Sequence, residues 1–166
     1  MLDISLDSRT ACAFTGHRPD KLPASLISLR AALRETILAA VECGYRDFIS
    51  GMAMGVDMLA AEEVLALREK YPLRLIAALP YRGQGDHFPA DQRRRHRQIL
   101  ARADLAQCIC DSYTPYCMNG RNRWMVENAG RLIAVFDGSP GGTANTVATA
   151  RQFMREIVVI NPFTGC

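Results

Sequence analysis

The stretch SGMAMGVD at positions 50–57 decides the fold class, because it joins two different apolar patterns. A short apolar run at 46–50 precedes it, and a helical pattern at 56–70 follows it. Gly51 and Gly55 permit a tight turn between the two, and they let backbone approach a ligand closely. A strand that passes through a glycine turn into a helix is typical of a parallel α/β sheet.

Two further turns of this kind are TGHRP at 15–19 and DGSPGGT at 137–143. In a parallel α/β sheet such turns lie at the carboxyl edge of the strands, so the three are expected to converge on one crevice. Exposed helix N–H groups, together with glycines that carry no Cβ, suit that crevice to phosphate or another anion.

The rest of the chain alternates between the same two kinds of element. We expect strands at 11–15, 46–50, 73–79, 105–110, 131–136 and 157–160, and helices at 26–43, 56–70, 90–103, 122–130 and 143–154. The strands are continuously apolar, which predicts a mostly parallel sheet covered by helices on both faces, a Rossmann-like three-layer α/β sandwich. The 166 residues are expected to form a single domain with a short amino-terminal extension at 1–10.

Charge and hydropathy restrict the possible partners. The formal net charge of +3 is too small to favour a dedicated nucleic-acid binder, which normally shows a strongly basic face. Residues 1–9 include two aspartates and no apolar core, so they do not resemble a signal peptide, and no apolar stretch approaches the ~20 residues of a membrane span. A cytoplasmic protein without a membrane partner is expected.

The six cysteines contain no C-x-x-C pair and the three histidines are scattered, so no metal site is predicted. Cys117 is expected in a polar loop beside Arg121 and Arg123, where a cation lowers the pKa of a thiol. It is the one cysteine that merits a reactivity test, although an ordinary structural cysteine is favoured there too. The basic run at 93–97 is interpreted as a solvated helix face rather than an anion-binding patch.

The candidate ligand-binding residues come from the three turns and from a polar cluster before the fifth strand. Arginine forks can clamp an anion, and small or hydroxylated residues at a helix start leave room for a docked group and can donate to it. Asp57 is either an acceptor for a ribose hydroxyl or a simple helix-start acid. The full set is Gly16, His17, Arg18, Ser50, Gly51, Gly55, Asp57, Arg121, Asn122, Arg123, Gly141, Gly142, Thr143 and Thr146.

These motifs together resemble the YpsA-like proteins of the SLOG superfamily. The resemblance runs from about residue 11 to the end, and it is carried by TGHRP, by SGMAMGVD with AAE at 60–62, by PY at 80–81 with Gln84, by RNRWMV at 121–126, and by LIAVFDG at 132–138 followed by GGT. The wider superfamily includes the LOG nucleotide phosphoribohydrolases and the DNA-processing protein DprA. The resemblance implies a Rossmann-like fold and a nucleotide or nucleotide-derived ligand in the crevice.

One departure from the LOG pattern bears on chemistry. LOG enzymes carry Pro-Gly-Gly-x-Gly-Thr-x-x-Glu with a catalytic Glu, whereas PGGTANTVA at 140–148 has no Glu in reach. Arg123 aligns with a LOG arginine, so ligand holding is expected to persist without that chemistry, and Asp137 is a candidate to replace the missing acid.

The sequence therefore predicts a ligand sensor or binding module for a nucleotide or nucleotide derivative, without LOG-type hydrolysis. An enzyme that cleaves or transfers at the glycosidic or phosphate bond of a nucleotide derivative is the alternative, with His17, Asp57 and Asp137 as catalytic candidates. DprA-like single-stranded DNA binding is third. No cofactor is predicted beyond the nucleotide-like ligand, and a homo-oligomer is left open.

Overall fold

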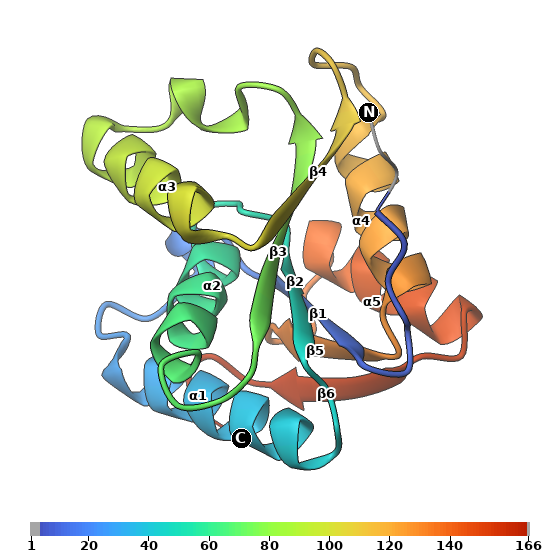
Figure 1. Ribbon diagram of the computed structural model, residues 1–166. Coiled ribbons are helices and arrows are strands. Elements are labelled where there is room, and N and C mark those ends of the chain that lie inside the picture. Colours follow the sequence, from blue (N-terminus) through green and yellow to red (C-terminus); the bar gives the residue numbers. More distant parts are fainter. Residues whose placement is uncertain (1–3, 166) are drawn as a thin grey trace.

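A computed structural model describes residues 4–165 and shows one six-stranded sheet in the order β4-β3-β2-β1-β5-β6 (Figure 1). Every pair of neighbouring strands is parallel. The strands are β1 (Ala11–Gly16), β2 (Asp47–Ser50), β3 (Arg74–Tyr81), β4 (Leu105–Cys110), β5 (Arg131–Val135) and β6 (Glu156–Ile160). The predicted parallel sheet is confirmed.

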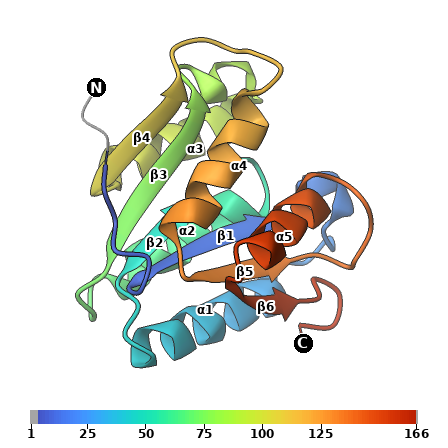
Figure 2. The same ribbon diagram turned by 90° about the vertical axis from the view of Figure 1, so that its right-hand side faces the viewer.

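Helices cover both faces of this sheet, as predicted (Figures 1 and 2). Helices α1 (Ile27–Glu42), α2 (Val56–Leu67) and α3 (Ala90–Arg102) lie on one face, and α4 (Cys117–Asn128) and α5 (Gly142–Gln152) lie on the other. Two short 3-10 turns, η1 (Pro19–Lys21) and η2 (Gln84–His87), follow β1 and β3. Within residues 4–165, no helix combines the length and the apolarity that crossing a membrane requires.

Strand β1 shows why the sequences of the central strands are continuously apolar. Its side chains alternate between the two faces of the sheet. Cys12 and Phe14 join the core formed with α1 and α2, whereas Ala11 and Ala13 join the core formed with α4 and α5. Because both faces are buried, neither set can be polar.

The strand order places a topological switch between β1 and β5. From β1 the chain proceeds outward through β2 and β3 to β4, and it then returns to form β5 on the other side of β1. The helices that follow β1 and β5 lie on opposite faces (Figure 2), an arrangement that favours a ligand crevice at the carboxyl ends of these two strands. The glycines of the three predicted turns, Gly16, Gly51 and Gly142, all lie at this edge.

Helix α4 is the main departure from the predicted elements. It begins at Cys117 instead of residue 122. Residues 117–122 lack the apolar periodicity that identifies a helix, but Cys117 and Arg121 are buried one turn apart on the face toward the sheet. The prediction of Cys117 in a polar loop is therefore wrong: its side chain is buried at the start of α4.

The basic run at 93–97 is also less uniform than predicted. Arg95 is mostly buried and pairs with Glu62 of α2, and the side chain of His96 is buried. Arg94 and Arg97 are exposed, as expected of a solvated face.

Candidate functional site

A cavity of about 320 Å³ opens at the crevice between the ends of β1 and β5. Its walls come from the turn after β1, the loop before α2, the start of α5, and α4. The structure brings together these predicted residues in its lining: Gly16, His17, Arg18, Asp57, Arg121, Asn122, Gly141, Gly142 and Thr143. Other predicted residues, Ser50, Gly51, Gly55, Arg123 and Thr146, are not part of that lining.

The start of α5 brings unpaired backbone N–H groups to the cavity. Gly141 is the N-cap residue, and the N–H of Asn145 makes the first intrahelical bond, to the Gly141 carbonyl at 3.0 Å. The N–H groups before Asn145 in the helix have no intrahelical partner, and they carry the positive end of the helix dipole. Thr143 is 8% exposed, and its hydroxyl makes no hydrogen bond to any residue in the described part of the chain. The Thr143 hydroxyl and the free N–H groups therefore line the same cavity.

His17 and Asp137 join the turn after β1 to the turn after β5. Nε2 of His17 lies 3.0 Å from Oδ1 of Asp137 and 3.2 Å from the Asp137 backbone nitrogen. The backbone N–H of Ser139 donates to the same carboxylate oxygen at 2.9 Å. Hydrogen bonds from Ser139 and then from His17 hold the pKa of the Asp137 carboxyl well below its usual range.

Asp137 is consequently a poor substitute for the absent LOG acid. A carboxyl group with so low a pKa is ionised at neutral pH and has no proton to donate. The side chain is also partly exposed and does not line the cavity. Its geometry fits an acceptor that positions the His17 ring.

Ser50 and Asp57 stabilise the loop between β2 and α2. The Ser50 hydroxyl donates to the Asp57 carbonyl at 2.8 Å and accepts from the Met52 N–H at 3.1 Å. Oδ2 of Asp57 accepts from the Ala53 N–H at 3.3 Å. Met52 is fully buried and has a φ of 58°, a left-handed conformation that these bonds help to hold. Ser50 thus supports the loop, and Asp57 both supports it and borders the cavity.

The sequence predicted that Gly51 leaves space for a ligand, but in the structure Gly51 lies against other groups of the protein. A Cβ at Gly51 would lie 2.6 Å from Nη1 of Arg121 and 2.7 Å from Oδ2 of Asp57. The Gly51 carbonyl accepts hydrogen bonds from Arg121 and, at 3.0 Å, from the side-chain amide of Gln84. The space left by the missing Cβ is therefore occupied by a buried arginine and a buried carboxylate.

Burial destabilises the charged forms of Asp57 and Arg121. Asp57 and Arg121 are 7% and 4% exposed, respectively. Desolvation raises the pKa of Asp57 and lowers that of Arg121, while the attraction between the two charges opposes both shifts. Arg121 also donates to Asn122 at 2.7 Å, so much of its donor capacity is used within the protein.

Gly16 and Gly55 let the first and second turns pack against each other. A Cβ on Gly16 would overlap the Val56 side chain, and one on Gly55 would overlap the His17 carbonyl. The same carbonyl accepts from the Val56 N–H at 3.2 Å, and Gly55 has a φ of 94°, which favours glycine. Gly55 therefore serves close packing of the two turns.

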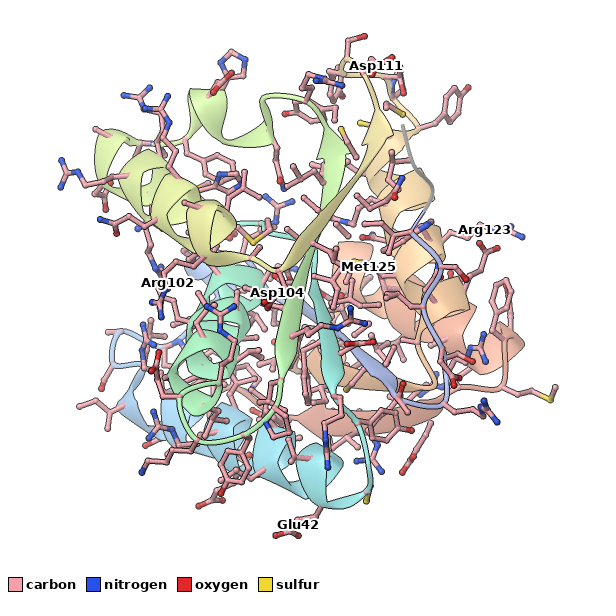
Figure 3. All side chains as sticks on the ribbon, in the orientation of Figure 1. Glu42, Arg102, Asp104, Asp111, Arg123 and Met125 are labelled. Carbon is pink, nitrogen blue, oxygen red and sulfur yellow. The ribbon has the colours of Figure 1, made fainter. Side chains whose placement is uncertain are left out.

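Arg123 and Thr146 lie in a separate groove between α4 and α5. Arg123 extends outward from α4, whereas Met125 of the same helix points toward the sheet (Figure 3). The Arg123 side chain pairs with Glu127 at 2.8 Å and lies 5.5 Å from the centre of the Phe153 ring. The structure therefore does not bring Arg123 to the anion cavity beside Arg18.

The sequence did not single out Lys21 and Ser139, which also line the cavity. Nζ of Lys21 lies 3.5 Å from the Pro140 carbonyl, so it joins the first and third turns. The Ser139 hydroxyl is buried and has no hydrogen-bond partner within residues 4–165. Lys21 comes two residues after TGHRP and Ser139 lies within DGSPGGT, so each had a local signal in its position beside or inside a predicted turn.

The fold and the crevice define a Rossmann-like α/β protein with an open helix N-terminus at its topological switch point. The sequence profile of the YpsA family, described as the YspA SLOG family, matches residues 12–161. The chain belongs to this family, as the motifs predicted.

Two bacterial relatives resemble most of the chain. The SPbeta prophage-derived protein YoqJ of Bacillus subtilis is 31% identical over 139 residues, which is 72% of this chain and 81% of that protein. A UPF0398 protein of Bacillus thuringiensis is 28% identical over 154 residues, covering 87% of this chain and 84% of that protein.

Solved structures of DNA processing protein A share the fold. The protein from Streptococcus pneumoniae superposes with a TM-score of 0.66 at 18% identity, over 93% of this chain and 52% of that one. The structure of the protein from Helicobacter pylori concerns its single-stranded DNA binding mode. It superposes with a TM-score of 0.66 at 17% identity, over 93% of this chain and 66% of that one. At this identity the likeness shows the fold alone, and the chain spans only about half to two thirds of either structure.

Proposed function

We propose that this protein binds a nucleotide or nucleotide-derived small molecule in the cavity between β1 and β5, as a binding module without LOG-type hydrolysis. One observation carries the proposal: the free N–H groups of α5 and the Thr143 hydroxyl, which no group in the described residues engages, line one cavity. A phosphate group supplies the acceptor oxygens that these donors lack.

The charges around the cavity support an anionic ligand. Arg18 and Lys21 are exposed residues at its rim, and neither cation is consumed by an ion pair in the described part of the chain. Two acids, Asp20 and Asp57, also line the cavity, but Asp57 lies beside the buried guanidinium of Arg121. The exposed cations are therefore the groups available to an incoming phosphate.

The chemistry of the acids favours binding over base release. Departure of a base needs a positioned proton donor or a stabilised ribosyl cation. Asp137 is held ionised, Asp57 is engaged by the loop N–H of Ala53, and PGGTANTVA offers no Glu. Asp137 and the third turn therefore do not supply the acid of a LOG enzyme, and Asp57, whose pKa is raised by burial, is held beside the guanidinium of Arg121.

Calorimetry and a product assay together test this function. Titration with AMP, ADP and an ADP-ribose-type compound is expected to show binding, and incubation with nucleoside 5′-monophosphates is expected to release no free base above background. Release of base that is lost in Asp137→Asn would replace the binding module with an enzyme. Absence of binding for every nucleotide would remove the ligand class and leave the fold unaffected.

Single-stranded DNA binding is a second candidate, despite the modest net charge. Tyr113 and Tyr116 are 65% and 79% exposed, the Tyr113 ring lies 5.4 Å from that of Tyr81, and Arg82 beside Tyr81 is exposed. Exposed aromatic rings beside a cation suit base stacking and backbone contact. Fluorescence polarisation with a labelled oligothymidylate tests this role: salt-sensitive binding that falls in Tyr113→Ala supports it, and no binding at low salt rejects it.

A further inference from the structure

A second hollow lies beside the first cavity, between α4 and α5. Its volume is about 320 Å³, and Asn122 lines both this groove and the cavity. Asn122 of α4 therefore lies at the border of both hollows.

The groove is lined by neutral amides. Asn119 and Asn122 from α4 face Asn145 and Gln152 from α5 across it. The side-chain amides of Asn119, Asn145 and Gln152 make no hydrogen bond to another residue in the part of the chain that the structure describes. These three residues are exposed, so the groove presents solvated donor and acceptor pairs that a ligand can engage.

The hydroxyl groups of the groove are already occupied. Thr146 donates to the Gly142 carbonyl and Thr149 donates to the Asn145 carbonyl, both at 3.0 Å. The one cation in the lining, Arg123, is paired with Glu127 and lies over Phe153. The unpaired cations border the cavity, whereas the groove offers amides and a guanidinium–aromatic surface.

We propose that this groove binds the nucleobase of the same ligand, with Asn122 at the junction beside the sugar. The inference rests on the proposed function and names its ligand class: a nucleotide whose phosphate meets the α5 N-terminus and whose base meets the amides. This division of charge matches a nucleotide, which is anionic at one end and neutral, planar and hydrogen-bonding at the other.

The dimensions agree with such a ligand. Gly142 and Thr149 are separated by seven residues, which is about 10 Å along α5 at ~1.5 Å per residue. A nucleoside monophosphate spans a comparable length from phosphorus to base edge. Asn and Gln amides pair in bidentate fashion with the N6 and N7 edge of adenine, so we infer that the groove prefers an adenine base.

Calorimetry on the full chain with AMP and with ribose 5-phosphate separates the base from the phosphate. AMP is expected to bind about tenfold or more tightly than ribose 5-phosphate, which lies within the range that one bidentate amide–base pair supplies. Asn119→Ala and Asn145→Ala are expected to remove most of that preference and leave ribose 5-phosphate affinity within about twofold. Gln98→Ala, an exposed glutamine on α3, is the matched control and is expected to change neither affinity.

The outcomes distinguish this inference from the proposed function. Equal affinities for AMP and ribose 5-phosphate, or an AMP preference that survives both groove variants, would overturn the nucleobase groove while the anion cavity stands. Failure of both ligands to bind the wild-type chain would overturn both proposals. A preference that is lost in the groove variants and retained in Gln98→Ala supports the inference.

Discussion

Nε2 of His17 lies 3.0 Å from Oδ1 of Asp137, and this contact joins two turns that are 120 residues apart in the chain. Because Ser139 also donates to that carboxylate, the third turn is closed around an ionised group. The contact draws the turns after β1 and β5 together beside the cavity.

Asp137→Asn is expected to reduce stability at neutral pH, by an amount that shrinks in acid. The folded-state pKa of Asp137 is lowered below the unfolded value of about 3.9, so the ionised carboxylate stabilises the fold above about pH 4, and this contribution declines as pH falls further toward the folded pKa. Thermal unfolding of wild type and variant at about pH 7 and about pH 3 measures the difference. Asp20→Asn, whose carboxylate makes no hydrogen bond within residues 4–165, is the control. A difference between wild type and Asp137→Asn that grows in acid would contradict the assignment.

Gly51→Ala is expected to destabilise the protein by ~1–3 kcal/mol, the usual cost of forcing atoms into a filled core. The added Cβ would meet Arg121 and Asp57, which are themselves buried. Gly142→Ala is the matched control, since a Cβ there meets nothing within 4 Å, and it is expected to change stability by less than about 1 kcal/mol. Urea unfolding measures both, and equal losses would show that Gly51 has room after all.

The sequence predicted the location of the crevice because its signals are local. A continuous apolar strand that ends in a glycine turn specifies the carboxyl edge of a parallel sheet without any knowledge of the partner strands. It could not predict what fills the space at Gly51, since Arg121 lies 70 residues away and approaches only after α4 packs on the sheet. The sequence also did not predict the first turn of α4. The buried residues of that turn are Cys117 and Arg121, and a buried arginine does not produce the apolar periodicity that identifies a helix.

The buried pair Asp57 and Arg121 is expected to behave as a unit in a double-mutant cycle. Asp57→Asn or Arg121→Met alone leaves one buried charge without its partner, a loss of ~3–5 kcal/mol. The double variant is expected to lose clearly less than the sum of the two. Denaturant unfolding with unchanged slope gives the three free energies of unfolding. Additive losses would indicate that the two groups do not interact, contrary to the attraction that opposes their pKa shifts.

Arg18→Ala is expected to weaken AMP binding roughly 10- to 100-fold, because a hydrogen bond to a charged group contributes ~1.5–3 kcal/mol. Arg18 lines the cavity from an exposed position, so its loss should leave the unfolding midpoint unchanged. Binding by the wild type should also weaken as salt rises, since exposed charges are screened.

Two other arginines make this a test of position as well as of charge. Arg94→Ala removes an exposed cation on α3, which lies on the face of the sheet opposite to α5. It is expected to leave AMP affinity within about twofold. Arg123→Ala, predicted from the sequence as a second phosphate clamp, is expected to leave ribose 5-phosphate affinity unchanged, because its guanidinium lies beside Glu127 and Phe153 in the α4–α5 groove. Calorimetry at moderate salt on the three variants decides the matter. Equal losses in Arg18→Ala and Arg94→Ala would place the anion site elsewhere, and a large loss of ribose 5-phosphate binding in Arg123→Ala alone would move the phosphate from the start of α5 into the groove.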